Sequence, residues 1–289
     1  MPFIKTVTND ALFYRDWGAG RPVVFCAAWA LSSIAWQHQM IAVVDSGCRA
    51  VAYDRRGHGR SDDATTGYDY DTLADDLAQL LTSLDLRSVT LVAHSMGSGD
   101  AVRYLTRHGT DRIDRLVLVA PTTPFLLRTP DNPDGVDARV FAERRNEWKK
   151  DFAQWVSANE GAYFGDGLPG CAVSPLMRDW TKADMLSTSL YAAIQFQQSG
   201  AETDFRDELA TLVVPTLILQ GDADASAPLA LTGSRTRALM PRCQLRVYEN
   251  APHALYLTHQ ERLNRDLMAF IEDDSCIEET TENQSKSAR

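Results

Sequence analysis

The chain contains a serine, two aspartates and a histidine in the order that nucleophilic hydrolysis requires. Ser95 follows the apolar run 89–93. His253 lies far downstream, behind the acidic pair Asp222 and Asp224. A serine hydroxyl attacks a carbonyl carbon well only when a base removes its proton during the attack. A histidine held by a carboxylate can take that proton and later give it to the leaving alcohol. These residue types therefore predict acyl transfer through Ser95.

The residues around Ser95 are typical of a nucleophile elbow, which is a sharp turn between a buried strand and a helix. Ala93 and Gly97 stand two residues before and two residues after the serine, where the strand and helix backbones cross closely. The first of these positions is usually glycine, so Ala93 is a mild departure. A serine between small residues can also be a simple helix cap. The downstream histidine and acids favour the catalytic interpretation.

The acid and the base are expected at the ends of later strands. Asp222 and Asp224 follow the apolar run 216–219. His253 follows the strand-like run 243–249. Because the carboxyl ends of parallel strands share one edge of a sheet, these side chains are expected near Ser95. Either aspartate could instead bond its own turn, and the histidine could cap the next helix, so the residues alone leave the acid open.

The oxyanion that forms during the attack needs N–H donors that are already in place. The backbone N–H of Met96, directly after the nucleophile, is the first candidate. The second is expected in the loop after the apolar run 23–28, where Trp29 stands. Losing one such donor typically lowers the rate about 10²- to 10³-fold.

Alternating strands and helices must position these residues. Two β-like runs, 3–8 and 12–17, open the chain and predict a hairpin. Short, continuous apolar runs follow, as expected for strands buried on both faces of a parallel sheet: 23–28, 49–53, 89–93, 116–120 and 216–219. Leucines at helical spacing from 73 to 84, and the segment 96–108, predict helices between them. The pattern indicates an α/β fold with a mostly parallel, doubly wound sheet.

One connection is far longer than a crossover needs. Roughly ninety residues separate the last two of these apolar runs, which predicts an inserted subdomain. We assign 1–125 and 212–273 to the core of the fold, and 126–211 to a helical insertion that we call the cap. The polar segment 274–289 is predicted to be a disordered tail.

The cap carries large aromatic side chains at helical spacing. Phe141, Trp148, Phe152 and Trp155 are predicted to lie on one face of a single helix. The candidates for an apolar substrate pocket are therefore Trp148, Phe152, Trp155, Trp180 and Phe196. The same stripe could equally serve only to attach the cap to the core.

Composition excludes several classes of partner. The formal net charge of −10 over 289 residues argues against nucleic acid, which is bound by clustered Lys and Arg. No run of 18 apolar residues and no signal-peptide pattern is present, so a cytoplasmic protein without a membrane partner is expected. The histidines and five cysteines lack metal-ligand spacing, and we predict neither a metal site nor a cofactor. The sequence does not fix the oligomeric state.

Several motifs together resemble the α/β-hydrolase superfamily, and within it the cofactor-free bacterial haloperoxidases, which are esterases with perhydrolase side activity. The resemblance runs from Phe3 to about Ile271 and rests on YDRRGHGRS (53–61), TGYDYD (66–71), SMG (95–97), DNPDG (131–135) and APH (251–253). It implies that Asp224, rather than Asp222, is the acid. One departure is Ala27-Ala28, where relatives carry His-Gly before the oxyanion residue. If position 28 needs a positive φ, Ala28 is strained.

The resemblance implies a serine-dependent carboxylic-ester or lactone hydrolase that works through an acyl-enzyme. The chain is also similar to esterases carried on antibiotic-resistance cassettes, some of whose relatives open macrolide lactones, so a macrolide is one expected substrate. A small aryl ester, with perhydrolase or haloperoxidase side activity, is the alternative. A non-catalytic ligand-binding protein is the second alternative, and Ala27-Ala28 is the feature that favours it.

Overall fold

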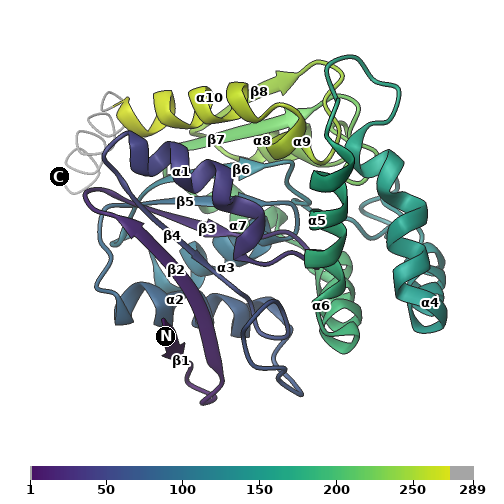
Figure 1. Cartoon of the computed structure of the whole chain (residues 1–289), viewed down its shortest axis with the longest axis horizontal. Coiled ribbons are helices and arrows are strands. Elements are labelled where there is room, and N and C mark those ends of the chain that lie inside the picture. The colour runs from purple at the N-terminus through teal and green to yellow at the C-terminus, as the bar shows by residue number, and fades with distance from the viewer. Residues whose placement is uncertain (1, 274–289) are drawn as a thin grey trace.

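The computed structural model describes residues 2–273, and the predicted tail 274–289 lies outside the described residues. Its centre is a sheet of eight strands in the order β1-β2-β4-β3-β5-β6-β7-β8. The strands are β1 (Phe3–Lys5), β2 (Ala11–Gly18), β3 (Pro22–Cys26), β4 (Arg49–Tyr53), β5 (Val89–His94), β6 (Ile113–Val119), β7 (Thr216–Gly221) and β8 (Cys243–Tyr248). Figure 1 shows this sheet in the middle of the molecule, with helices around it.

The strand directions confirm the predicted sheet. β1 and β2 form an antiparallel hairpin, and β2 pairs antiparallel with β4. The hairpin turns at Asn9, which adopts a positive φ of 66°, a conformation that asparagine tolerates better than most residues. From β4 to β8 every neighbouring pair is parallel. The carboxyl ends of these six strands therefore meet along one edge.

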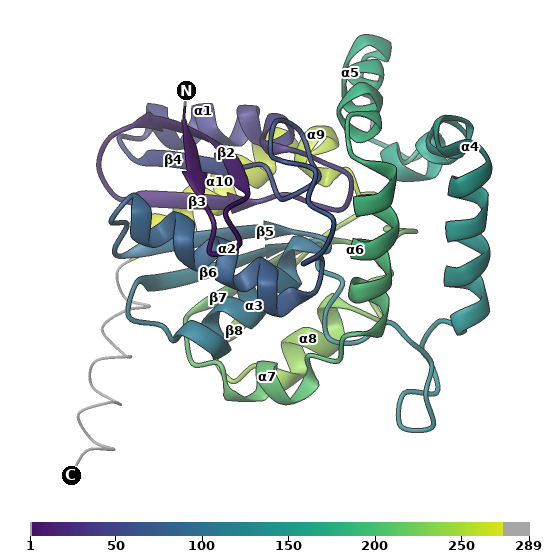
Figure 2. The same ribbon diagram turned by 90° about the horizontal axis from the view of Figure 1, so that it is seen from below.

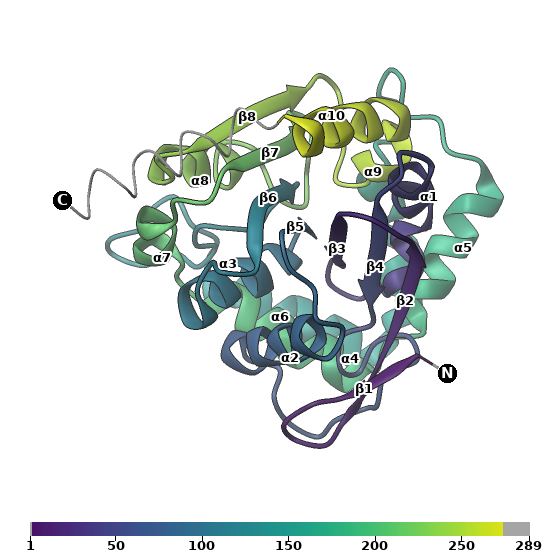
Figure 3. The same ribbon diagram turned by 90° about the vertical axis from the view of Figure 1, so that its left-hand side faces the viewer.

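Helices cover both faces of the sheet because the buried strands are apolar on both sides. In β3, Val24 and Cys26 pack with α2 (Tyr70–Ser83) and α3 (Gly97–His108). The alternate residues Val23 and Phe25 pack on the other face, with α1 (Gln37–Asp45) and α10 (Gln260–Glu272). Figure 3 shows the sheet passing between these two helix layers. This is the doubly wound arrangement that the apolar runs predict.

Four helices lie between β6 and β7, the two strands that the long connection joins. They are α4 (Ala138–Phe164), α5 (Pro175–Leu186), α6 (Leu190–Glu202) and α7 (Arg206–Thr211). Figures 1 and 2 show α4, α5 and α6 beyond the carboxyl ends of the strands, on the side where the candidate residues are expected. The boundaries assigned to the cap remain a prediction.

The prediction of one continuous aromatic helix was wrong. α4 is interrupted at Asp151, where φ is −160° and ψ is 90°. The Asp151 carboxylate accepts a hydrogen bond from the Gln154 backbone N–H at 2.8 Å, so it caps the second half of α4 as a new helix. Phe141 and Trp148 lie before this kink, and Trp155 lies after it.

The remaining helices are short and lie near the loops of the core. They are η1 (Ser33–Trp36), α8 (Gly233–Leu239) and α9 (Leu255–Thr258). None of the helices between residues 2 and 273 combines the length and the apolar character that crossing a bilayer requires.

Candidate active site

Ser95 occupies a sharp turn between β5 and α3. Its φ is +54°, a left-handed conformation that a side chain rarely adopts. The Ser95 N–H donates to the Val119 carbonyl at 2.9 Å, which ties the turn to β6. A Cβ on Gly97 would lie 2.6 Å from the Ala27 carbonyl oxygen, so only glycine lets α3 start this close to the loop after β3. Ala93 is fully buried in the sheet.

His253 and Asp224 lie beside Ser95. The Ser95 Oγ lies 2.8 Å from His253 Nε2, and His253 Nδ1 lies 2.7 Å from Asp224 Oδ2. All three residues are at most 5% exposed. Because the Asp224 carboxylate accepts a hydrogen bond from Nδ1–H, the proton stays on Nδ1 and the lone pair of Nε2 is directed at the hydroxyl. This is the geometry in which an imidazole can deprotonate a serine.

Backbone donors hold the Asp224 carboxylate in place. Its Oδ1 accepts hydrogen bonds from the N–H groups of Ser226, at 2.9 Å, and Ala227, at 2.8 Å. The alternative acid, Asp222, is exposed, and its carboxylate accepts a hydrogen bond from the Asn250 N–H at 2.7 Å. Asp222 therefore ties two loops together, and Asp224 is the aspartate that contacts His253.

A second histidine, His94, contacts His253. The His94 Nε2–H donates to the His253 carbonyl oxygen at 3.2 Å, and the two rings are 4.9 Å apart. Burial holds the pKa of His94 well below its usual range. His94 is thus a neutral donor that fixes the backbone carrying His253.

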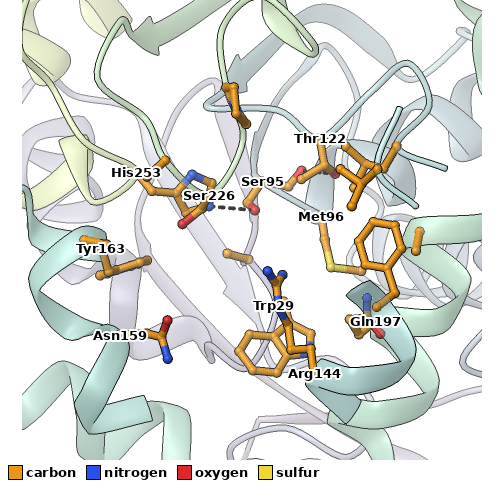
Figure 4. A pocket seen from close by; sticks show the side chains of 18 of the residues that line it. Trp29, Ser95, Met96, Thr122, Arg144, Asn159, Tyr163, Gln197, Ser226 and His253 are labelled. Atoms are coloured by element: carbon orange, nitrogen blue, oxygen red, sulfur yellow. Dashed lines mark hydrogen bonds between the residues drawn. The ribbon is translucent and has the colours of Figure 1, made fainter. Parts of the chain in front are cut away.

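Trp29 and Met96 border the same cavity as Ser95 and His253 (Figure 4). Within residues 2–273, neither the backbone N–H of Trp29 nor that of Met96 donates a hydrogen bond to a protein acceptor. The Tyr70 hydroxyl donates to the Met96 carbonyl at 3.0 Å, which fixes the start of α3. Both N–H groups are therefore free to bind an oxygen of a bound molecule, as an oxyanion hole requires.

The buried guanidinium of Arg55 holds the loop that contains Ala27-Ala28 in place through hydrogen bonds. Arg55 donates to the Ala27 carbonyl at 2.8 Å and to the Ala28 carbonyl at 3.4 Å. It also forms a buried ion pair with Asp100 of α3, at 2.6 Å. The condition for strain at Ala28 is not met, because the positive φ in this loop occurs at Ala30, where it is 55°. Sequence reasoning missed this brace, since its members are 45 residues apart.

The cavity above Ser95 has a volume of about 330 Å³. Of the five aromatic pocket candidates, Trp148 and Trp155 line it. Both also contact Trp29, with ring centroids 4.4 Å and 5.9 Å away. The sequence left open whether the aromatic stripe lines the pocket or attaches the cap to the core. Trp148 and Trp155 do both, because their rings border the cavity and pack against Trp29 of the core.

The other three candidates lie outside the lining of this cavity. Phe152 packs edge-on against Trp29 at 5.8 Å. Phe196 is fully buried, with the Arg55 guanidinium 4.3 Å above its ring. Trp180 is 40% exposed and packs against His38 of α1. An aromatic residue type does not reveal which side of a helix faces the cavity, which is why the sequence could not separate these three.

The described part of the chain contains no group of three or more His, Cys, Asp or Glu side chains that could hold a metal ion. The cavity lining carries hydroxyl, amide and charged groups among its apolar side chains, including Thr122, Asn159, Tyr163, Gln197 and Ser226 (Figure 4).

Comparisons with known proteins agree with this fold. Residues 21–260 match the family model for the alpha/beta hydrolase fold. A non-heme chloroperoxidase of Kitasatospora aureofaciens is 41% identical over 276 residues, which is 94% of this chain and 99% of that protein. A bifunctional esterase/perhydrolase of Acinetobacter calcoaceticus is 34% identical, again over 94% of this chain and 99% of that protein. The crystal structure of a bromoperoxidase from Bacillus anthracis superimposes with a TM-score of 0.87, at 34% identity, over 91% of this chain and 96% of that one.

The chain therefore belongs to the α/β-hydrolase family. Within that family it is an enzyme of the haloperoxidase and esterase type, as the resemblance implied.

Proposed function

We propose that this enzyme hydrolyses carboxylic esters through an acyl-enzyme on Ser95. The observation that carries the proposal is the buried chain of contacts from Asp224 to His253 to Ser95, at 2.7 Å and 2.8 Å, at the floor of a cavity. A structural helix cap would need neither the histidine nor the carboxylate.

In the first half of the reaction, His253 Nε2 takes the Ser95 proton while Oγ bonds to the ester carbonyl carbon. The carbonyl oxygen becomes an oxyanion, and the N–H groups of Trp29 and Met96 donate to it. As the carbon–oxygen bond to the alcohol breaks, the imidazolium returns its proton to the leaving alcohol. Asp224 stabilises the imidazolium throughout.

In the second half, water replaces the alcohol. His253 takes a proton from the water, the resulting oxygen bonds to the acyl carbon, and Ser95 leaves with the proton that the imidazolium returns. Hydrogen peroxide in place of water would give a peracid by the same steps. Perhydrolysis is therefore expected as a side reaction, in keeping with the esterase/perhydrolase relative.

The cavity volume bears on the substrate. About 330 Å³ lies at the lower end of the roughly 300–1,000 Å³ of pockets that enclose drug-sized ligands. This favours a small aryl or alkyl ester. A lactone uses the same chemistry, with the alcohol remaining attached to the acyl group. A macrolide lactone stays a prediction from the sequence, and mass spectrometry after incubation tests it, since an intact ring would reject it.

Hydrolysis by this enzyme should depend on Ser95 alone as the nucleophile. We expect the wild type to hydrolyse members of a panel of aryl esters, simple lactones and macrolides, and Ser95→Ala to lose this turnover by a factor of about 10⁴ or more. Ser83→Ala, at an exposed position of α2, is the matched control and should retain full activity. Equal rates for Ser95→Ala and the wild type would refute the proposal.

A further inference from the structure

Four charged side chains line the cavity, and three of them are paired. Lys182 forms an ion pair with Glu160 at 2.7 Å. Arg235 forms an ion pair with Asp134 at 2.7 Å and donates to the Asn132 amide oxygen. Arg144 borders the same cavity, and residues 2–273 offer it no ion-pair or hydrogen-bond partner.

Arg144 lies on the cavity face of α4. It stands three residues after Phe141 and four residues before Trp148, and all three line the cavity. Its guanidinium lies 5.9 Å from the centre of the Trp155 ring, which comes from the second half of α4, beyond the kink. Figure 4 shows Arg144 with Trp29 and Ser95 around the same space. A kinked α4 thus presents an oriented cation to whatever occupies the cavity.

The positive charge of this guanidinium is not neutralised by an ion pair within the described residues. Arg144 is half-buried, and the removal of water lowers its pKa, while Glu147 only partly offsets this effect. A cation that has lost part of its hydration and has no acidic partner gains free energy when an oxygen acceptor binds to it. Its planar fork of N–H donors fits a carboxylate through two parallel hydrogen bonds.

We propose that Arg144 binds an oxygen acceptor of the substrate that is remote from the scissile carbonyl. The proposal rests on the ester hydrolysis described above and narrows its substrate class. The preferred esters carry a second oxygen-containing group, remote from the scissile carbonyl, that reaches Arg144 of α4. A carboxylate should bind this guanidinium most strongly. The overall charge of −10 suggests a cationic substrate, but the only unpaired charge of the described cavity lining is positive.

Three 4-nitrophenyl esters that differ only at the far end of the acyl chain test this: hexanoate, 6-hydroxyhexanoate and the adipate monoester. We expect Arg144→Met to lower kcat/KM about 10- to 100-fold for the adipate monoester and less than about tenfold for the hydroxyl ester, with little change for the hexanoate. Arg144→Lys should recover part of the preference for the adipate monoester, since it keeps the charge but loses the planar fork.

Arg139→Met is the matched control on the same helix. The Arg139 side chain is 84% exposed and pairs with Asp137, outside the cavity, so the ratios among the three esters should stay at wild-type values. Hydrolysis of the hexanoate by Arg144→Met shows that the variant is folded and that its serine reacts. The proposal is overturned if the ratios of Arg144→Met equal those of the wild type within about twofold. Failure of the wild type to hydrolyse any of the three would instead refute the proposed esterase function.

Discussion

At the scale of single residues, the site depends on two backbone positions whose conformations are unusual. Ser95 adopts a positive φ that lifts its hydroxyl out of the turn. Gly97 permits α3 to begin against the loop that carries Trp29. The sequence predicted the elbow and a small residue at position 97, because a nucleophile elbow is a local pattern of small residues around a serine. The contact of Gly97 with the end of β3 and the loop after it is a tertiary contact that this pattern does not contain.

Replacing Gly97 with alanine should damage the oxyanion site. The added Cβ would lie 2.6 Å from the Ala27 carbonyl oxygen and 2.9 Å from that of Cys26, and both are backbone atoms that must move. We expect kcat to fall about 10²-fold, comparable to the loss of one oxyanion donor. Gly161→Ala is the control, because its Cβ meets only the Asp166 side chain, at 3.0 Å. Wild-type kcat in Gly97→Ala would show that the spacing between α3 and this loop is not critical.

Residue types alone could not assign the pocket. Trp148 and Phe152 are both aromatic and four residues apart, yet only Trp148 lines the cavity. The kink at Asp151 lies between them and redirects the helix. Arg144 stands between Phe141 and Trp148, and a charged residue at this place in an apolar stripe could have indicated a polar group in the pocket. The sequence-based prediction considered only the aromatic residues.

At the scale of elements, the predicted cap helices are joined to the loop that follows Trp29. Asp184 of α5 accepts hydrogen bonds from the Ser32 N–H and hydroxyl, and the Thr188 hydroxyl donates to the Ala30 carbonyl at 3.1 Å. The Trp29 indole N–H donates to the Ala193 carbonyl of α6 at 2.8 Å. These contacts link residues more than 150 positions apart, so no local pattern could have predicted them.

The Asp184 contact should make stability depend on pH. Burial raises the pKa of Asp184 to about 6 in the folded chain, against 3.8 for a free side chain. A raised pKa means that the protonated form favours folding, so this contribution is complete below about pH 4 and is lost as the pH rises through 6. The free energy of unfolding of the wild type relative to Asp184→Asn should therefore fall by up to about 3 kcal/mol between pH 4 and pH 7.

Urea unfolding of both proteins at several pH values measures this difference. The comparison with Asp184→Asn removes the contributions that other titrating groups make equally to both proteins. A difference that stays constant from pH 4 to pH 7 would contradict the raised pKa of this carboxyl.

At the scale of the whole molecule, topology rather than sequence proximity builds the site. Ser95, Asp224 and His253 follow β5, β7 and β8, whose carboxyl ends meet at one edge because these strands run parallel. The sequence predicted this convergence from buried apolar runs and the order of the three residues. It could not predict the shape or charge of the cavity, because these depend on how α4 bends over that edge.

The central claim is that these three distant side chains make one serine reactive, and a fluorophosphonate probe tests it most directly. Mass spectrometry should find one phosphonyl group per wild-type chain, on the peptide that contains Ser95, and none on Ser95→Ala. Labelling of His253→Ala and Asp224→Ala should be slowed by several orders of magnitude. An unlabelled wild type, or a Ser95→Ala variant labelled as fast as the wild type, would contradict the account.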